Sequence, residues 1–256
     1  MIWLIYILFG ILGLSVGSFL NVCIDRLPAG GSLLFPPSRC DTCGKKLTIL
    51  DLVPVVSYLF LRGRCRYCQN HIPVHSIMVE LITGLLFVVA LAVHGPNLSL
   101  ATTVVYGSLF IVIIFIDAEK QLILNKIIYP AGWGLPVGAV FGYLYSSLTP
   151  GILGGLLGAA IGFGFFLAVY LIYPKGLGAG DVKLAGFIGL VSGFPLLFVS
   201  LFIGIVLGGL IAIIILIARP DMRRKPLPYG AFLGIGPIIT LLWGNQIFNW
   251  YWGQFF

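Results

Sequence analysis

Two sets of residues in this 256-residue chain are of the types that carry chemistry. The first is a pair of aspartates, Asp117 and Asp181, each of which lies beside a long apolar stretch. The second is two Cys-x-x-Cys pairs, formed by Cys40, Cys43, Cys65 and Cys68. Two carboxylates that meet can divide the roles of acid and base, whereas paired thiolates are typical zinc ligands. The sequence therefore suggests an acid-base centre and a separate metal centre.

The aspartates stand out because the chain holds only eight acidic residues. An ionisable side chain next to a membrane span is costly and is a candidate for function. Asp117 follows the apolar stretch 101–116, and Asp181 comes just before the stretch 184–196. We expect both at the same membrane boundary, where one carboxylate could activate water while the other protonates a substrate.

The residues around Asp181 allow both a functional and a structural interpretation. Gly178 and Gly180 lack a Cβ, so the chain can turn sharply there and a substrate backbone can approach closely. Alternatively, each aspartate merely ends a helix, with Asp181 as an N-cap residue or as a partner of Lys183.

The elements that position these residues are membrane helices. The chain is 59% hydrophobic and 9% charged, with a mean hydropathy of +1.09, which excludes an ordinary water-soluble domain. Eight stretches approach the length of about 20 apolar residues that a span requires, and they do not alternate as β-barrel strands would. They are 2–22, 76–94, 101–116, 127–145, 151–173, 184–196, 198–218 and 230–250. We predict an all-α polytopic membrane protein with about eight transmembrane helices.

The chain is expected to fall into three segments. Residues 1–23 form the first transmembrane helix, because no Lys or Arg precedes the apolar run as it would in a signal peptide. Residues 24–75 form a small cysteine-rich loop domain, and residues 76–256 form a seven-helix membrane domain.

The basic residues predict the orientation in the membrane. With the N-terminus outside, all fifteen Lys and Arg residues fall on the inner side, as the excess of positive charge in cytosolic loops requires. The 24–75 loop and both aspartates would then face the cytosol. The formal charge of +7 is spread over four loops, so we expect contact with anionic membrane lipids and no nucleic-acid partner.

The four cysteines have close to zinc-ribbon spacing, since twenty-one residues separate the two pairs. A reducing cytosol disfavours disulfides there, and a loop of about fifty residues with few apolar side chains needs a staple to fold. Four thiolates leave no open coordination position, so the expected zinc is structural. His71 and His75 could supplement the zinc ligands, although four cysteines already suffice. Cys23 has no pairing partner and is expected to be a buried apolar residue.

Several motifs in collinear order resemble those of the type IV prepilin peptidases. They are the segments 17–22 (Gly-Ser-Phe-Leu-Asn-Val), 26–28 (Arg-Leu-Pro), 61–66 (Leu-Arg-Gly-Arg-Cys-Arg), 117–125 and 180–184 (Gly-Asp-Val-Lys-Leu), together with the paired cysteines. The resemblance implies an inner-membrane enzyme that cleaves the basic leader from prepilins or pseudopilins after a glycine. It implies that the enzyme then methylates the new N-terminal residue with S-adenosylmethionine. By motif match, Asp117 and Asp181 are catalytic, and Gly178, Gly180 and Lys183 support them.

The chain departs from the family pattern at two places. Asn125 stands where the family often has an aspartate, and the region 75–80 keeps Glu80 but lacks the usual Arg and Tyr. That region is associated with methylation in the family. Asn21, Arg26 and Glu80 are the residues we expect at the methyl-donor site, although each could instead anchor or cap a helix at the membrane interface.

Two other functions remain open at the level of sequence. One is a peptidase without methyltransferase activity, like the shorter archaeal preflagellin relatives. The other is a transporter or scaffold with a zinc-stapled cap, in which the two aspartates would relay protons or bind ions. The sequence does not indicate which pilins are processed, whether the enzyme serves pili, secretion or DNA uptake, or which oligomeric state it adopts.

Overall fold

Long apolar runs fold into helices in this protein, because only a helix satisfies its own backbone hydrogen bonds in lipid without forming a closed sheet. The computed structural model describes residues 2–129, 151–174, 176–218 and 228–255. Within these residues every regular element is a helix, and strand pairing is limited to two isolated bridges. The all-helical fold class is therefore confirmed for the described part of the chain.

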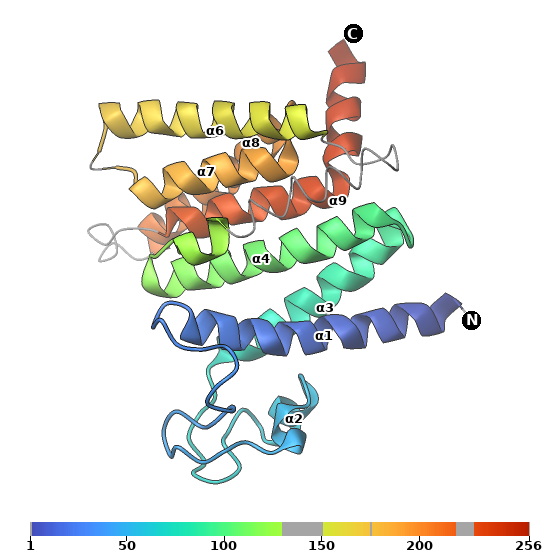
Figure 1. Ribbon diagram of the computed structural model, residues 1–256, viewed down its shortest axis with the longest axis vertical. Coiled ribbons are helices and arrows are strands. Elements are labelled where there is room, and N and C mark those ends of the chain that lie inside the picture. The colour runs from blue at the N-terminus through green and yellow to red at the C-terminus, as the bar shows by residue number, and fades with distance from the viewer. Residues whose placement is uncertain (1, 130–150, 175, 219–227, 256) are drawn as a thin grey trace. The chain divides into compact units, whose positions relative to one another are not determined.

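The helices follow one another along the chain as Figure 1 shows. They are α1 (Ile2–Arg26), η1 (Ile49–Leu52), α2 (Val56–Phe60), α3 (Val74–His94), α4 (Leu98–Lys120), α6 (Ile152–Ile172), α7 (Ala179–Ser192), α8 (Leu196–Ala218) and α9 (Tyr229–Phe255). Six of them, α1, α3, α4, α6, α8 and α9, contain stretches long and apolar enough to cross a membrane. Six of the expected spans are thus confirmed by length and composition.

The other two expected spans have different outcomes. The stretch 127–145 lies almost entirely outside the described residues. The stretch 184–196 corresponds to α7, but its expected bounds are wrong, since the helix begins at Ala179 and ends at Ser192. It ends there because Gly193 takes a positive φ of 70° and Pro195 follows. With 14 residues α7 extends for about 21 Å, which is shorter than a bilayer core.

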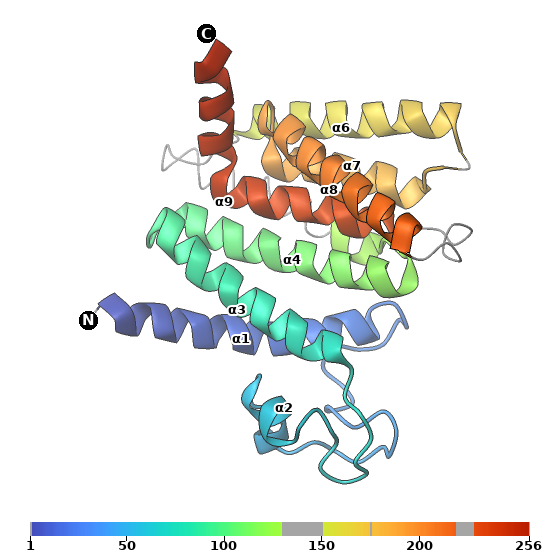
Figure 2. The same ribbon diagram turned by 180° about the vertical axis from the view of Figure 1, so that it is seen from behind.

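The described chain divides into two compact units, residues 1–96 and residues 97–256. In the first unit α1 packs along α3 (Figure 2), and glycines allow the two helices to approach closely. A Cβ on Gly17 would lie 2.7 Å from Cα of Glu80, and one on Gly13 would lie 2.9 Å from Cα of Gly84. The loop that holds the cysteines connects α1 to α3 and belongs to this unit. The three-segment division expected from the sequence stays a prediction.

In the second unit, α4, α6, α7, α8 and α9 surround a core of aliphatic and aromatic side chains. Its fully buried members include Phe110, Ile113, Leu184, Ile188 and Leu233. Helix α7 packs against α6, and α9 contacts α4, α7 and α8. This arrangement brings the end of α4 and the beginnings of α7 and α9 into one unit.

Candidate active site and metal centre

Asp117 lies in the last turn of α4. The sequence placed it after its helix, but α4 continues to Lys120 because Ala, Glu and Lys are good helix formers that a hydropathy profile does not register. The side chain is buried, and its Oδ2 atom accepts a hydrogen bond from the backbone N–H of Ala231 at 2.7 Å. This N–H belongs to the first turn of α9, where backbone donors have no partner within the helix. The beginning of α9 therefore holds the carboxylate at the end of α4.

Asp181 is the third residue of α7 and is also buried. The structure places it inside the helix, and Gly178 rather than Asp181 is the N-cap residue. Asp181 Oδ2 accepts a hydrogen bond from the N–H of Gly178 at 3.0 Å. A carboxylate in the first turn is also stabilised by the positive end of the helix dipole. Asp181 thus caps the beginning of α7, and it lies in the same compact unit as Asp117.

The two carboxylates lie close enough to interact electrostatically. Ile123, which follows α4, packs between two glycines that border the pair. A Cβ on Gly180 would lie 3.1 Å from Cβ of Ile123, and one on Gly230 would lie 2.9 Å from its Cδ1 atom. A Cβ on Gly230 would also lie 3.0 Å from Oδ2 of Asp117. Larger residues at these two glycines would therefore displace either Ile123 or the carboxylate itself.

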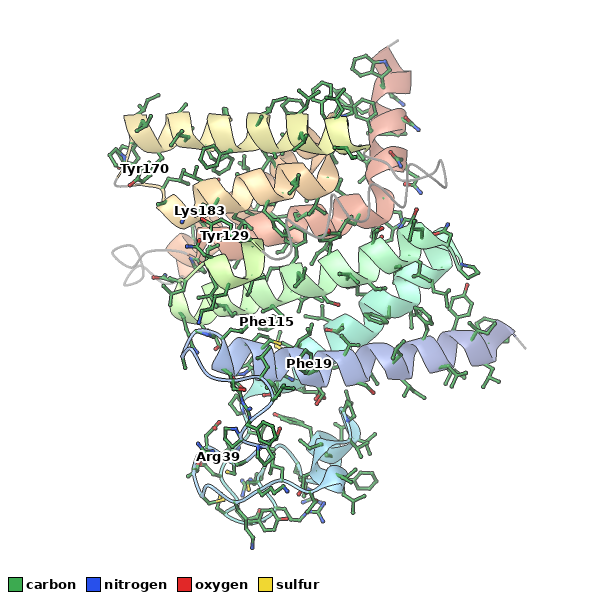
Figure 3. The ribbon with its side chains drawn as sticks, viewed as in Figure 1. Phe19, Arg39, Phe115, Tyr129, Tyr170 and Lys183 are labelled. Carbon is green, nitrogen blue, oxygen red and sulfur yellow. The ribbon has the colours of Figure 1, made fainter. Side chains whose placement is uncertain are left out.

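Two further side chains border the pair. Tyr229, the first residue of α9, interacts electrostatically with Asp181. Lys183, which Figure 3 labels on α7, donates a hydrogen bond to Oδ1 of Asn125 at 3.1 Å. The amide of Asn125 is therefore the observed partner of this lysine.

Sequence reasoning missed the beginning of α9 as a part of this site. The backbone N–H of Ala231 and the absent side chain of Gly230 are what the site uses, and neither is visible in a search for reactive side chains. The one available signal is the Pro228-Tyr229-Gly230 sequence directly before the last apolar stretch, which indicates a sharp change of backbone direction.

The two Cys-x-x-Cys pairs form two local turns of the same design. In the first, Cys40 donates its N–H to the carbonyl of Lys45 and accepts the N–H of Gly44. In the second, Cys65 donates to Asn70 and accepts from Gln69 in the corresponding manner. The fifth residue of each turn has a left-handed conformation, with φ of 69° at Gly44 and 59° at Gln69. The pairs therefore fold as two equivalent knuckles.

The knuckles face each other and bring all four sulfur atoms within 4.8 Å of one another. The Sγ atoms of Cys40 and Cys68 are 3.8 Å apart, which is too far for a disulfide. A tetrahedral zinc site with Zn–S bonds of about 2.3 Å has S···S edges of about 3.8 Å. The cluster therefore fits zinc in both donor type and spacing, and neither His71 nor His75 belongs to it.

The thiols of the cluster do not ionise equally. Backbone N–H groups of Cys43 and Thr42 stabilise a thiolate at Cys40 and lower its pKa to about 6. The N–H of Asn70 likewise favours a thiolate at Cys68, but desolvation and the other three sulfur atoms raise the pKa of Cys68 to about 11. A cation held among the four sulfur atoms would remove this conflict, because it stabilises every thiolate at once.

A cavity of about 520 Å³ lies within residues 1–96, bordered by the end of α1, the start of α3 and the cysteine loops. Asn21, Arg26 and Glu80 all line it, as does Arg39, which Figure 3 labels on the loops. Asn21 donates its Nδ2 to the carbonyl of Ser76 at 2.9 Å, while its buried Oδ1 atom has no hydrogen-bond partner among the described residues. The cavity is thus lined by charged groups of both signs, and a buried acceptor without a partner among the described residues belongs to one of its lining residues.

Two family models match this chain. Residues 11–94 match the bacterial peptidase A24 N-terminal domain, and residues 104–213 match the type IV leader peptidase family. No solved structure matches the chain.

Several curated proteins are similar to the chain over nearly its whole length. The prepilin leader peptidase/N-methyltransferase of Aeromonas hydrophila is 31% identical over 97% of this chain and 94% of its own length. The protein of the same name from Bacillus subtilis is 35% identical over 94% of this chain and 95% of its own length. The one from Dichelobacter nodosus is 33% identical, with 93% and 91% covered.

Proposed function

Because the chain belongs to the family of prepilin leader peptidases/N-methyltransferases, we propose that it cleaves the basic leader from prepilins or pseudopilins and methylates the new N-terminus. The observation that carries the proposal is the burial of Asp117 and Asp181 together at the ends of α4 and α7. A membrane enzyme that hydrolyses a peptide bond needs an acid and a base at one place, and these two carboxylates supply both groups.

In the proposed cleavage, the two carboxylates share one proton because two neighbouring negative charges in a buried site are unfavourable. The ionised aspartate removes a proton from water as the water attacks the scissile carbonyl. The protonated aspartate donates to the carbonyl oxygen, and the departing amine later receives a proton from the pair. The N–H groups of Gly178 and Ala231 keep one oxygen of each carboxylate oriented, which leaves the other oxygen available for this exchange.

The substrate must be extended where it is cut, because a helix hides its carbonyl groups in internal hydrogen bonds. The scissile segment therefore lies at the membrane boundary, with the apolar part of the prepilin in the bilayer and its basic leader in the cytosol. The glycine-bordered surroundings of the aspartates support this arrangement, since Gly178, Gly180 and Gly230 carry no side chains to obstruct an extended backbone.

We place methyl transfer in the cavity of residues 1–96, because it is large enough for a nucleoside cofactor. S-adenosylmethionine supplies an activated methyl group when it is bound there. Arg26 would bind its carboxylate, Glu80 would face its positive charge, and Oδ1 of Asn21 would accept from its amino groups. The unpartnered, buried oxygen of Asn21 supports this assignment, because buried acceptors in native proteins normally have a donor.

The cysteine cluster is assigned to a structural Zn²⁺ held by Cys40, Cys43, Cys65 and Cys68. The two equivalent knuckles support this role, since both are closed by backbone hydrogen bonds and neither offers a ligand position to a substrate. The metal would hold the loops that border the cavity in one conformation. It therefore supports methyl transfer without taking part in the chemistry.

The six apolar helices and the family both point to an inner-membrane protein. We place its N-terminus outside and both sites on the cytosolic side, because this orientation puts the basic residues of the loops inside. The loop residues 219–225 that contribute to this rule lie outside the described residues. Lipids are the expected surroundings, and nucleic acid is not an expected partner.

The test of cleavage uses purified protein in lipid with a prepilin substrate, and mass spectrometry to detect the product. Asp117→Asn and Asp181→Asn should each lower the cleavage rate by at least about 100-fold, because each removes one acid-base group. Glu119→Gln, two residues from Asp117 on the exposed end of α4, is the matched control and should keep its activity. Cleavage at the wild-type rate by either aspartate variant would exclude the pair as the catalytic centre.

The methyl-donor site is tested separately by equilibrium binding of S-adenosylmethionine to the protein. Glu80→Gln should weaken binding by roughly tenfold, as expected for the loss of one charge-assisted contact, while Glu119→Gln should leave it unchanged. Unchanged binding in folded Glu80→Gln protein would remove this residue from the site.

A further inference from the structure

The loop that carries the cysteines contains an exposed apolar surface, although few apolar side chains were expected there. We call residues 49–60, which comprise η1, α2 and the residues between them, the apolar segment. Seven of its large side chains are exposed: Ile49, Leu50, Leu52, Val53, Val56, Leu59 and Phe60. Ile49 and Phe60 are each 85% exposed, and η1 contacts α2, so the side chains belong to one surface. A contiguous apolar surface of this kind indicates an interaction site.

A hydrogen bond fixes the position of the apolar segment along α3. The backbone N–H of Val55 donates to Oε2 of Glu80 at 2.7 Å. Glu80 is the seventh residue of α3, roughly 9 Å from its first residue along the helix axis. The 21 residues of α3 are about as long as the bilayer core is thick. Val55 therefore lies beside the membrane-spanning part of α3 rather than beyond its end.

The views of the first unit agree with this position. Figures 1 and 2 show α2 projecting from the cysteine loops in the direction of the N-terminal end of α1. The apolar segment thus extends back alongside α1 toward its N-terminal end.

The backbone of the apolar segment is suited to a lipid environment, in which unpaired N–H groups are costly. Ser57 donates its N–H to Val53, Leu59 to Val55 and Leu61 to Ser57, and Pro54 has no N–H to satisfy. These internal pairings satisfy several of the backbone N–H groups of the segment without water.

Charges are also arranged as they are in segments that lie at a membrane surface. Asp51 is the single charged residue between positions 47 and 61, and it forms an ion pair with Arg66 at 2.7 Å. Basic residues follow the segment directly, at Arg62 and Arg64, and both are exposed. Such residues bind anionic headgroups while neighbouring apolar side chains enter the acyl region.

We propose that the apolar segment enters the lipid leaflet beside the start of α3 and anchors the cysteine module to the membrane surface. Its occupant is lipid, with acyl chains against Ile49, Leu59 and Phe60 and anionic headgroups near Arg62 and Arg64. Because Val55 binds Glu80, the anchor also fixes one wall of the neighbouring cavity. The opening of that cavity is thereby held near the interface, where an apolar polypeptide would present its terminus.

The test places a photoreactive phenylalanine analogue at position 60 of the full chain in nanodiscs of phosphatidylethanolamine and phosphatidylglycerol. Position 69, an exposed glutamine on the second knuckle, is the matched control. Irradiation followed by mass spectrometry of the peptides identifies what each position contacts. We expect phospholipid adducts at position 60 in several-fold excess over those at position 69.

Three results would overturn the proposal: equal lipid labelling at both positions, no adduct at position 60, or cross-links from position 60 to residues 97–256. The last would show that the surface contacts the other half of the protein. Retained zinc content establishes that each labelled protein is folded, and position 49 serves as the second labelling site if position 60 fails this check. The same three results at position 49 would overturn the proposal.

Discussion

The aspartate pair and the cysteine cluster are assembled in opposite ways. The four cysteines lie on two copies of one short turn, and each turn is closed by hydrogen bonds between residues close together in the sequence. Asp117 and Asp181 instead lie 64 residues apart, and Asp117 is oriented by the N–H of Ala231, which is 114 residues away. The cysteine cluster should therefore depend on its metal, and the aspartate pair on the packing of helices.

The largest effect should follow from removal of the metal. Structural zinc sites contribute on the order of 10 kcal/mol to the folding of small domains, so Cys43→Ser should abolish zinc binding and unfold the cysteine loops. Zinc content and hydrogen exchange within residues 38–72 measure this directly. Cys23→Ala, which changes the one cysteine outside the cluster, should retain the metal. Protected loops in zinc-free protein would show that the metal is dispensable.

The dependence on packing is tested at Gly230. Its substitution by alanine places a Cβ 3.0 Å from Oδ2 of Asp117 and 2.9 Å from Cδ1 of Ile123. Displacement of a catalytic group by about 1 Å can lower a rate about 100-fold, so cleavage by Gly230→Ala should fall by this order. Gly164→Ala in α6, where a Cβ meets no atom within 4 Å, is the control and should cleave normally. Equal cleavage rates for Gly230→Ala and Gly164→Ala would mean that the carboxylate of Asp117 tolerates displacement.

A smaller effect is expected from Gly162, on the face of α6 that contacts α7. A Cβ there would lie 2.5 Å from the carbonyl oxygen of Ala185. Overpacking of this kind typically costs about 1–3 kcal/mol, so Gly162→Ala should lower the thermal midpoint in lipid relative to Gly164→Ala. A midpoint at or above that of the wild type would show that α6 and α7 can separate without loss of stability.

The smallest effect concerns Asp51 in the cysteine module. Burial raises the pKa of this carboxyl, but hydrogen bonds from Thr48 and the charge of Arg66 outweigh burial and lower it below its usual range. The ion pair therefore stabilises the fold above the ordinary pKa and is lost as the pH falls through the lowered value. Since Arg66 is half exposed, the gain is a few tenths of a kcal/mol. Wild type should exceed Asp51→Asn in stability at pH 7, and the difference should begin to shrink at about pH 4 and vanish once the pH lies below the lowered pKa. A difference that persists in acid would show that the charge is irrelevant.

Much of this architecture could be predicted from the sequence, because lipid-spanning helices and Cys-x-x-Cys turns are both local patterns. The pairing of Asp117 with Asp181 was predicted from the membrane boundary that the sequence led us to expect for both. The ends of the helices could not be predicted in this way. Helix α4 continues to Lys120 and α7 begins at Ala179, beyond the apolar residues of each stretch. The N–H donor of Ala231 and the missing side chain of Gly230 could not be predicted, because both are features of the backbone. The apolar segment was not predicted, because η1 and α2 are far too short to span a membrane.

The two regions are proposed to perform separate reactions, and one crosswise measurement tests this separation. Asp181→Asn and Glu80→Gln proteins in lipid are each assayed for cleavage of a full-length prepilin and for methylation of a pre-cleaved pilin. We predict that Asp181→Asn loses cleavage by at least about 100-fold and keeps methylation, whereas Glu80→Gln keeps cleavage and loses methylation. Loss of both reactions in both variants, with zinc content and thermal midpoint unchanged, would contradict the assignment of the two reactions to two sites.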